Sequence, residues 1–292
     1  MGFRTVIVNS RCKLEFRLNY VVIRGEREKR IFINEINTLI VQSTAVSLTA
    51  ALLCELTRNN VKVIFCDEKN NPQTELVAYY GAHNTSKRFR EQFRWDEYIK
   101  REIWQTIIRQ KIINQARVLL DFGFIPEGNT LMAYSQEVRS GDITNREGHA
   151  AKVYFNCLMP EGVSRRSGGF FNACLNYGYA VILSAFNREI VASGYLTQLG
   201  IWHDNEFNPF NLSCDLMEPL RPVIDRVAYS LEENDECFKR KMADILNYHA
   251  TINGKNTTLD IAIRMYVHSV WEALNIKDSS KIYFPEQVYS NE

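Results

Sequence analysis

Four acidic or imidazole side chains in this sequence are of the types that metal-assisted chemistry uses. Glu147 lies in the run N-R-E-G-H-A-A-K-V-Y-F, and His203 ends the run G-I-W-H. Asp215 and Glu218 belong to a third run, D-L-M-E-P-L-R-P. Because the three runs are far apart in the sequence, only tertiary folding could assemble one site from them.

Together these residues form a mixed set of nitrogen and oxygen ligands. Carboxylates suit Mg²⁺ and Mn²⁺, and an imidazole shifts the preference toward Mn²⁺. Three protein ligands on an octahedral ion leave room for water and a phosphate oxygen, as phosphoryl transfer requires. Structural roles stay open at this point: Glu147 could pair with an arginine, His203 could pack beside Trp202, and Asp215 could cap a helix.

The segment around Glu147 should form a helix that positions this carboxylate. Asn145 can cap it by accepting a hydrogen bond from a free amide of the first turn. Glu147, Ala151 and Tyr154 would then share one face. A carboxylate on a stripe with Ala and Tyr is half buried, and a buried carboxylate needs a partner.

Composition limits the class of protein. The 292 residues carry a net charge of +1 and 46% hydrophobic side chains, which is typical of a soluble globular protein. Any anion binding must therefore come from local clusters of charge. The seven cysteines are scattered without a C-x-x-C pair, which argues against a disulfide framework and a structural zinc site. No signal-peptide pattern or membrane segment is visible, so we expect a cytoplasmic protein without membrane association.

We expect an α+β fold with a small N-terminal β-rich domain and a larger all-α C-terminal domain. The N-terminal domain, residues 1–80, contains short β-branched runs and one helical pattern at 46–56. Small polar residues at 81–87 predict an interdomain linker. The C-terminal domain, residues 88–292, contains the candidate catalytic residues. The N-terminal domain is then a module for dimerisation or for contacts with a partner.

Helical periodicity dominates after the expected linker. Residues 88–122 could form one long helix with isoleucines along a stripe. Pro219 and Pro222 fit the first turn of a helix over 215–231 better than its interior. We expect further helices over 131–138, 146–159, 171–193, 235–250 and 257–275. The polar, tyrosine-rich end from residue 277 onward is expected to be loosely ordered.

A local excess of basic residues marks the start of the helical part. Between Ser86 and Arg117 the sequence has nine Lys or Arg residues against four Asp or Glu residues, in a chain that is nearly neutral overall. Composition alone favours a solvated helix face. The other interpretation is a surface that contacts an anionic partner.

The three runs, in this order, resemble the CRISPR adaptation integrase family, whose members insert new spacers into a CRISPR array. Two flanking stretches also fit this family, N-A-C-L-N-Y-G-Y-A at 172–180 and V-K-V-I-F-C-D-E at 61–68. The resemblance covers essentially the whole chain. The S-R-C-K-L start, the segment 79–83 and N-R-E-G-H-A-A resemble the type II branch of the family, in which a single effector acts.

The resemblance implies a catalytic metal site. Glu147, His203 and Glu218 correspond to the family's metal ligands and catalytic residues, and Asp215 is an additional acid. Glu218 stands where many relatives carry Asp, which keeps the charge on a longer side chain. The implied cofactor is Mg²⁺ or Mn²⁺. The groups that would support the ligands or contact DNA are Tyr154, Asn176, Arg221 and Arg146.

The implied reaction is metal-dependent joining of DNA by transesterification. The 3′-hydroxyl of a short prespacer attacks a phosphodiester of the CRISPR repeat, and no covalent enzyme intermediate is required. Phosphate contacts position DNA without reading its sequence. On this interpretation the phosphate-binding residues are Lys87, Arg88, Arg90, Arg94, Arg109, Lys111, Arg139, Arg165 and Arg166.

The resemblance also implies partners. The chain would bind double-stranded DNA, both prespacer and CRISPR repeat, and would form a homodimer. A small ferredoxin-like CRISPR adaptation protein would bridge two dimers into a hetero-hexamer. Two other functions stay open: a non-catalytic scaffold that binds DNA ends with the same fold, and a stand-alone metal-dependent nuclease that cuts branched DNA without a partner.

Overall fold

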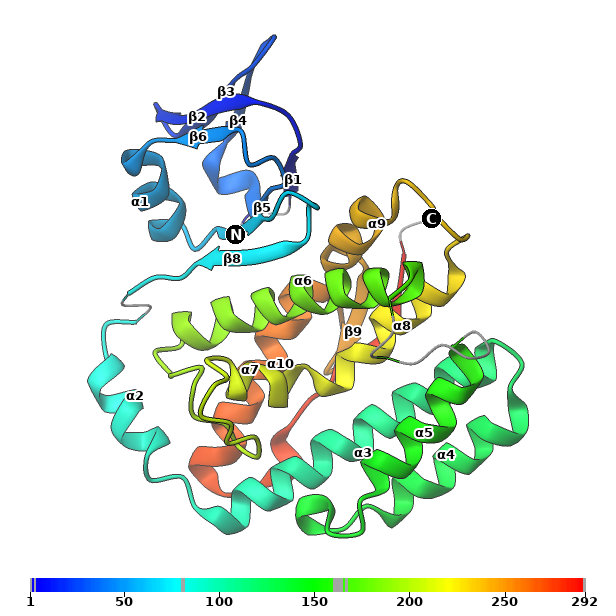
Figure 1. Cartoon of the computed structure of the whole chain (residues 1–292). Coiled ribbons are helices and arrows are strands. Elements are labelled where there is room, and N and C mark those ends of the chain that lie inside the picture. The colour runs from blue at the N-terminus through cyan, green and yellow to red at the C-terminus, as the bar shows by residue number, and fades with distance from the viewer. Residues whose placement is uncertain (1, 3, 80–81, 160–164, 166–167, 291–292) are drawn as a thin grey trace.

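The computed structural model describes residues 2, 4–79, 82–159, 165 and 168–290. It has a strand-rich N-terminal part and a larger, mostly helical C-terminal part (Figure 1). The expected division into a strand-rich beginning and a helical remainder is confirmed in this coarse form. Within the described ranges, every helix is too short or too polar to cross a bilayer.

Two four-stranded sheets make up the N-terminal part of the described chain. In the sheet with order β1-β5-β7-β8, the first three strands are parallel and β8 is antiparallel to β7. In the sheet with order β4-β3-β2-β6, β6 runs parallel to β2 and the other pairs are antiparallel. The strands are β1 Arg4–Val8, β2 Cys12–Arg17, β3 Tyr20–Arg24, β4 Glu28–Phe32, β5 Ile36–Val41, β6 Val46–Leu48, β7 Lys62–Cys66 and β8 Pro72–Leu76.

Helix α1, Ala50–Arg58, completes the core of this N-terminal part. Its Leu52 and Leu56 are fully buried and belong to one cluster with Leu14 of β2 and Leu39 of β5. Every residue of β5 is buried, as expected for a central parallel strand that is covered on both faces. The N-terminal part therefore has an apolar core of its own, while Ile40, Ile64 and Cys66 of its sheet belong to the core of the helical part.

Side-chain caps determine the first residues of two helices, and both helices begin later than the sequence predicted. The helix expected over 46–56 was wrong in its first turn, because those residues form β6 and Thr49 caps α1. The single helix expected over 88–122 was also wrong. It is divided into two helices because Asp96 accepts hydrogen bonds from the amides of the second helix's first turn.

The helices of the C-terminal part are α2 Thr85–Gln92, α3 Glu97–Asp121, α4 Ile125–Glu137, α5 Arg146–Leu158, α6 Phe170–Ala192, α7 Asn211–Met217, α8 Arg221–Ser230, α9 Phe238–Asp244 and α10 Leu259–Ile276. Short 3₁₀ turns occur at η2 Ser140–Asp142 and at η3 Glu218–Leu220. Helix α2 begins inside the expected linker 81–87. As expected, Pro219 and Pro222 lie in first turns, those of η3 and α8, but the single helix expected over 215–231 is divided among α7, η3 and α8.

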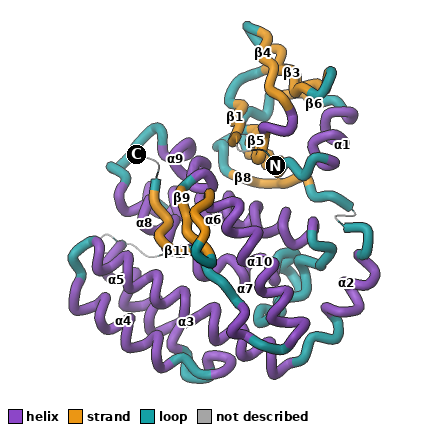
Figure 2. The backbone as a smooth tube through the Cα atoms, turned by 180° about the vertical axis from the view of Figure 1, so that it is seen from behind, coloured by secondary structure: helices purple, strands orange, loops and turns teal. Residues whose placement is uncertain are grey.

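The C-terminal part is not all-α, which corrects the sequence prediction. A three-stranded antiparallel sheet, order β10-β9-β11, is formed by β9 His249–Ile252, β10 Lys255–Thr258 and β11 Glu286–Tyr289. Asn253 and Gly254 have positive φ, which is typical of the tight turn between two hairpin strands. The helix expected over 235–250 is wrong at its end, because β9 begins at His249. The loosely ordered end that was expected from residue 277 onward is also wrong, because Glu286–Tyr289 form β11 and pair with β9. Figure 2 shows this sheet apart from the N-terminal strands.

Two long helices organise the C-terminal part. Helix α6 packs against β7 and β8 on one side and against α7, α8, α9 and α10 on the other (Figure 1). Most of its residues are buried, as expected for a helix that is apolar around most of its circumference. Helix α3 packs along α4 and α5 and also contacts η2, η3 and α8. The segments that carry the candidate site therefore converge on α3.

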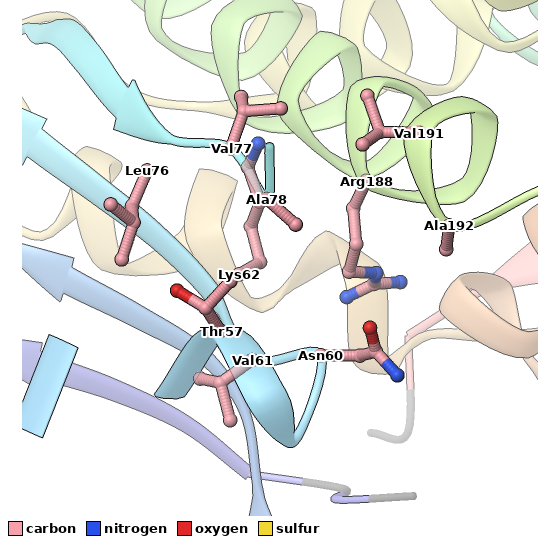
Figure 3. Close-up of a pocket in the computed structure, with 10 residues that line it drawn as sticks. All are labelled: Thr57, Asn60, Val61, Lys62, Leu76, Val77, Ala78, Arg188, Val191 and Ala192. Carbon is pink, nitrogen blue, oxygen red and sulfur yellow. The ribbon is translucent and has the colours of Figure 1, made fainter. Parts of the chain in front are cut away.

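Buried polar contacts join the N-terminal part to α6. Glu75 of β8 pairs with Lys62 and accepts hydrogen bonds from Ser184 Oγ at 2.7 Å and Asn187 Nδ2 at 2.6 Å. Arg188 donates from α6 to Asn37 Oδ1 at 2.8 Å. Figure 3 shows Lys62 and Arg188 beside a cavity of about 30 Å³. That volume holds about one water molecule, so the cavity is a packing gap and not a substrate pocket.

Candidate active site

A lysine stands at the centre of the candidate site. Lys111 lies near the middle of α3, and its Nζ is 2.6 Å from Glu147 Oε1 of α5 and 2.5 Å from Glu218 Oε2 of η3. Lys111 and Glu218 are buried, whereas the side chain of Glu147 keeps 30% of its surface exposed. One ammonium group thus joins two carboxylates from elements that are distant in sequence.

The burial of Lys111 corrects its expected place among the phosphate-binding residues. It lies on the inner face of α3, one turn after Ile107 and one turn before Gln115, both of which are buried. With Nζ held between Glu147 and Glu218, Lys111 does not present a free charge to solvent in this arrangement.

The start of α5 holds Glu147 in place. Asn145 has left-handed backbone angles and its side chain accepts a hydrogen bond from Gly148 N at 3.3 Å, which confirms the expected cap. Asp142 of η2 accepts from the amides of Arg146 at 2.9 Å and Glu147 at 3.0 Å. These contacts satisfy free amides of the first turn and leave the Glu147 side chain free to face α3.

Glu218 is held by charge and by a short turn. Pro219 O accepts a hydrogen bond from Asn114 Nδ2 of α3 at 2.7 Å, which ties η3 to α3. Arg221 Nε donates to Glu218 Oε1 at 2.8 Å. Burial alone would raise the pKa of Glu218, but the charges of Lys111 and Arg221 outweigh it and lower that pKa to about 2. Glu218 is therefore ionised at neutral pH.

The pKa of Lys111 is raised, so its ammonium stays charged beside the ionised Glu218. Burial opposes the charged form of its amine, but the carboxylates of Glu218 and Glu147 outweigh burial and raise the pKa. The ammonium is therefore charged at neutral pH.

Asp215 orients the imidazole of His203. Its buried carboxylate accepts hydrogen bonds from the backbone amides of Ile201 at 2.6 Å, Trp202 at 2.9 Å and His203 at 3.1 Å. Oδ1 also lies 2.5 Å from His203 Nδ1. Because an ionised carboxylate only accepts, Nδ1 carries the hydrogen in the neutral ring, and Nε2 keeps a lone pair for a ligand. Asp215, expected as an additional acid, is thus occupied as a positioning residue.

Electrostatics link His203 to both predicted acidic ligands. The hydrogen bond to Asp215 raises the pKa of His203 most, burial opposes it, and the charges of Asp215, Glu218 and Glu147 add to the increase. Tertiary folding has therefore placed His203 within the field of Glu147 and Glu218.

An aromatic stack forms a wall beside His203. Trp202 stacks on Trp104 of α3 with ring centroids 5.6 Å apart and an interplanar angle of 6°. The same Trp104 meets the imidazole of His203 edge-on at 5.5 Å. Gly141 has a φ of +66°, and a Cβ there would lie 3.2 Å from the Trp202 ring, so the close approach favours glycine. Packing and Asp215 together limit how the imidazole can turn.

The donor atoms of Glu147, Glu218 and His203 are of the types that bind a divalent cation. In this structure, however, the charges of the two carboxylates are neutralised by Lys111. Two ionised carboxylates and an imidazole nitrogen are suitable ligands for Mg²⁺ or Mn²⁺. In the part of the chain that the structure describes, no three His, Cys, Asp or Glu side chains are grouped tightly enough to hold a metal ion. The Lys111 ammonium instead neutralises the carboxylates of Glu147 and Glu218.

Of the residues expected to support the ligands or contact DNA, Arg221 touches a predicted ligand directly, through Glu218. Arg146 forms an ion pair with Glu137, with Nη2 2.6 Å from Oε2, and its guanidinium lies over the ring of Tyr134. Asn176 Oδ1 accepts a hydrogen bond from Arg165 at 3.1 Å.

Tyr154, also expected near the ligands, is fully buried near Asp225, a carboxylate that was not among the expected site residues. Burial and the charge of Asp225 both raise the pKa of Tyr154 well above its usual range. Tyr179 donates a hydrogen bond to Asp225, and the guanidinium of Arg221 lies 4.7 Å from the Tyr179 ring centre. Burial raises the pKa of Asp225 to about 6, against the hydrogen bond that Tyr179 donates and the charge of Arg221. Asp225 lies seven residues, or about two helical turns, after Glu218. This spacing was the sequence signal that could have placed Asp225 on the same side as Glu218.

The remaining basic residues differ in their exposure. Arg88 is half buried and pairs with Glu91 at 2.8 Å, and Arg165 donates to Asn172 at 2.6 Å. Arg166 lies outside the described residues. The expected phosphate-binding residues with exposed side chains are Lys87, Arg90, Arg94, Arg109 and Arg139.

The fold is a strand-rich part followed by a larger helical part, and the helical part carries this acid-and-histidine site. A family model described as CRISPR associated protein Cas1 matches residues 5–255. The chain belongs to this family, and the family expected from the sequence is confirmed.

A curated relative agrees with this assignment, and solved structures show a similar fold. The CRISPR-associated endonuclease Cas1 of Neisseria meningitidis serogroup C (strain 8013) is 32% identical over 294 residues, covering 98% of this chain and 97% of the relative. A structure titled "Casposase bound to integration product" has a similar fold, with a TM-score of 0.74 at 20% identity, over 95% of this chain and 93% of that one. A chain of a "Cas6-RT-Cas1--Cas2 complex" aligns with a TM-score of 0.73 at 17% identity, over 100% of this chain and 36% of that one.

Proposed function

We propose that this protein is a metal-dependent DNA integrase of CRISPR adaptation that joins the 3′-hydroxyl ends of short prespacer DNA to a CRISPR repeat by transesterification. The observation that carries the proposal is that Lys111 of α3 pairs with both Glu147 and Glu218, while His203 packs against Trp104 of the same helix. The curated relative is named an endonuclease, and the casposase neighbour is described with an integration product, which supports the same class of chemistry.

Each residue of the site has a distinct role in this proposal. Glu147, Glu218 and His203 Nε2 would hold Mg²⁺ or Mn²⁺. When bound, the ion supplies Lewis-acid polarisation of a phosphoryl oxygen and stabilises developing charge. Arg221 keeps Glu218 ionised and oriented, and Asp215 keeps the Nδ1 hydrogen in place so that Nε2 stays available.

The stacked Trp104 and Trp202 restrict motion of the imidazole in the same proposal. A ligand nitrogen that is held in one direction loses little freedom when it binds, so the reacting groups can be aligned at a small entropic cost. No protein nucleophile is required, because the DNA 3′-hydroxyl attacks directly.

DNA and partner binding belong to the same proposal. The exposed residues Lys87, Arg90 and Arg94 lie on and just after α2, where they can neutralise phosphates. The Cas1–Cas2 neighbour supports association with a small ferredoxin-like adaptation protein. We propose a homodimer, two of which join with that partner in a hetero-hexamer, and a domain boundary at 81–87 between a dimerisation domain and the catalytic domain.

The experiment is strand transfer of a labelled short duplex into a supercoiled plasmid that carries a CRISPR repeat. Reactions contain Mn²⁺, Mg²⁺ or EDTA, with and without the small partner, for wild type and His203→Ala. His149→Ala is the matched control, because His149 is an exposed histidine on α5. We expect joining that requires the metal, is lost in His203→Ala with DNA binding retained, and persists in His149→Ala.

Two outcomes would favour the other functions. Binding of DNA ends without joining under any metal would support a non-catalytic scaffold. Cleavage of branched DNA at the same rate with and without the partner, and no strand transfer, would support a stand-alone nuclease.

A further inference from the structure

The position of Lys111 has a consequence for metal binding. Its Nζ lies within 2.6 Å of a carboxylate oxygen from Glu147 and from Glu218, which are two of the three ligands in the proposed function. An ammonium and a divalent ion cannot occupy the same position between two carboxylates. At a shared site the like charges repel strongly, because the surroundings are largely desolvated. Metal binding at these carboxylates and the present position of Lys111 therefore exclude one another.

A second observation shows where the ammonium can go. Gln115 lies one helical turn beyond Lys111 on the same inner face of α3 and is almost fully buried. Its Oε1 is buried without a hydrogen-bond partner among the described residues. Residues four apart on a helix have Cβ atoms about 6 Å apart, which the flexible lysine stem spans. A buried carbonyl oxygen without a donor normally costs stability, so this acceptor needs an explanation.

We propose that Lys111 is a two-position counter-cation: it neutralises Glu147 and Glu218 in the metal-free protein, and an arriving divalent cation displaces its ammonium to Gln115 Oε1. This inference rests on the proposed function, since it takes Mg²⁺ or Mn²⁺ to bind at these carboxylates. Lys111 then sets the metal affinity, because every binding event must break its two ion pairs. Because 30% of the Glu147 side chain is exposed, an ion can reach this carboxylate from solvent.

The two positions make opposite predictions for two substitutions. Lys111→Met keeps an unbranched side chain that is one atom shorter and removes the competing charge, so Mn²⁺ should bind about tenfold more tightly. Gln115→Met removes the acceptor for the displaced ammonium, so Mn²⁺ should bind about fivefold more weakly. In the double variant the Gln115→Met effect should disappear, because the group that it serves is absent.

The measurement is a titration of full-length protein with Mn²⁺ at fixed pH, with free Mn²⁺ followed by electron paramagnetic resonance. Lys152→Met is the matched control: Lys152 is exposed on α5, and its loss changes the net charge by the same amount. Opposite shifts for Lys111→Met and Gln115→Met, with Lys152→Met unchanged, support the proposal. Equal affinity in wild type and Lys111→Met overturns it, as does a Gln115→Met effect that survives in the double variant.

Failure of the proposed function gives a different result. If neither wild type nor Lys111→Met binds Mn²⁺, the carboxylates are not a metal site, and both proposals fall. If wild type binds Mn²⁺ but the affinity does not depend on Lys111, only the present inference falls. Should Lys111→Met fail to fold, Lys111→Arg keeps a cation that pairs more firmly with carboxylates. It should weaken Mn²⁺ binding at least about tenfold, and unchanged binding would overturn the inference.

Discussion

Asp215 Oδ1 lies 2.5 Å from His203 Nδ1, and the same buried carboxylate accepts the backbone amides of residues 201–203. One side chain thus sets both the shape of the loop and the tautomer of the imidazole at its end. The position of the candidate ligand nitrogen depends on a residue that does not itself face the reacting groups.

Replacing Asp215 by Asn should therefore affect His203 and the loop together. The amide has one acceptor oxygen in place of two and no charge, so the pKa of His203 should fall toward its ordinary value. Loss of charge-assisted hydrogen bonds should cost about 1–3 kcal/mol of stability. Nuclear magnetic resonance titration of His203 and urea unfolding measure the two effects. Asp204→Asn, an exposed neighbour, is the control, and an unchanged His203 titration would contradict this assignment.

Asp225 should make stability depend on pH. Its folded pKa is raised from 3.8 to about 6, so its contribution to stability is fully present below pH 3.8 and is lost as pH rises through 6. Between pH 4 and 8, wild type should lose about 2 kcal/mol relative to Asp225→Asn, which has no such titration. Urea unfolding of both proteins across this range measures the difference. Parallel pH profiles would show that Asp225 titrates normally, and the exposed Asp244→Asn serves as the control.

Glu75 should be a large contributor to the contact between the two parts. Removing its carboxylate in Glu75→Ala leaves the buried Lys62 without its partner and also removes the acceptor of Ser184 and Asn187. Breaking one side of a buried pair costs about 3–5 kcal/mol. The free energy of unfolding from urea titration measures this loss. The exposed Glu68→Ala should change it little, and a similar small loss in Glu75→Ala would refute the role.

Arg90 offers a test of the expected DNA-binding surface. Its side chain is exposed on α2, so neutralising it in Arg90→Gln should weaken duplex binding alike for different sequences. The slope of log affinity against log salt should decrease in magnitude by about 0.9 if one phosphate contact is lost. Fluorescence anisotropy at several salt concentrations measures the slope. Arg27→Gln, which changes an exposed arginine of the N-terminal part, should leave the slope unaltered; equal slopes in all three proteins would exclude the contact.

Local signals were enough for several features of this protein. Periodicity predicted the order of strands before helices. Short runs of residues predicted the Asn145 cap and the family. The placement of Pro219 and Pro222 in first helical turns also followed, because proline lacks an amide hydrogen. Each of these properties depends on residues that are close together in the chain.

Other features depend on contacts between distant residues, and only the tertiary structure decided them. A lysine on a helix has the same local signal whether it faces water or a carboxylate that lies 36 residues away, so Lys111 was assigned to the DNA surface. Pairing of β11 with β9 likewise depends on a strand that is distant in the sequence. The candidate ligands could be named from the sequence, but the lysine between them could not. Its burial and its charge are favourable only together with Glu147 and Glu218.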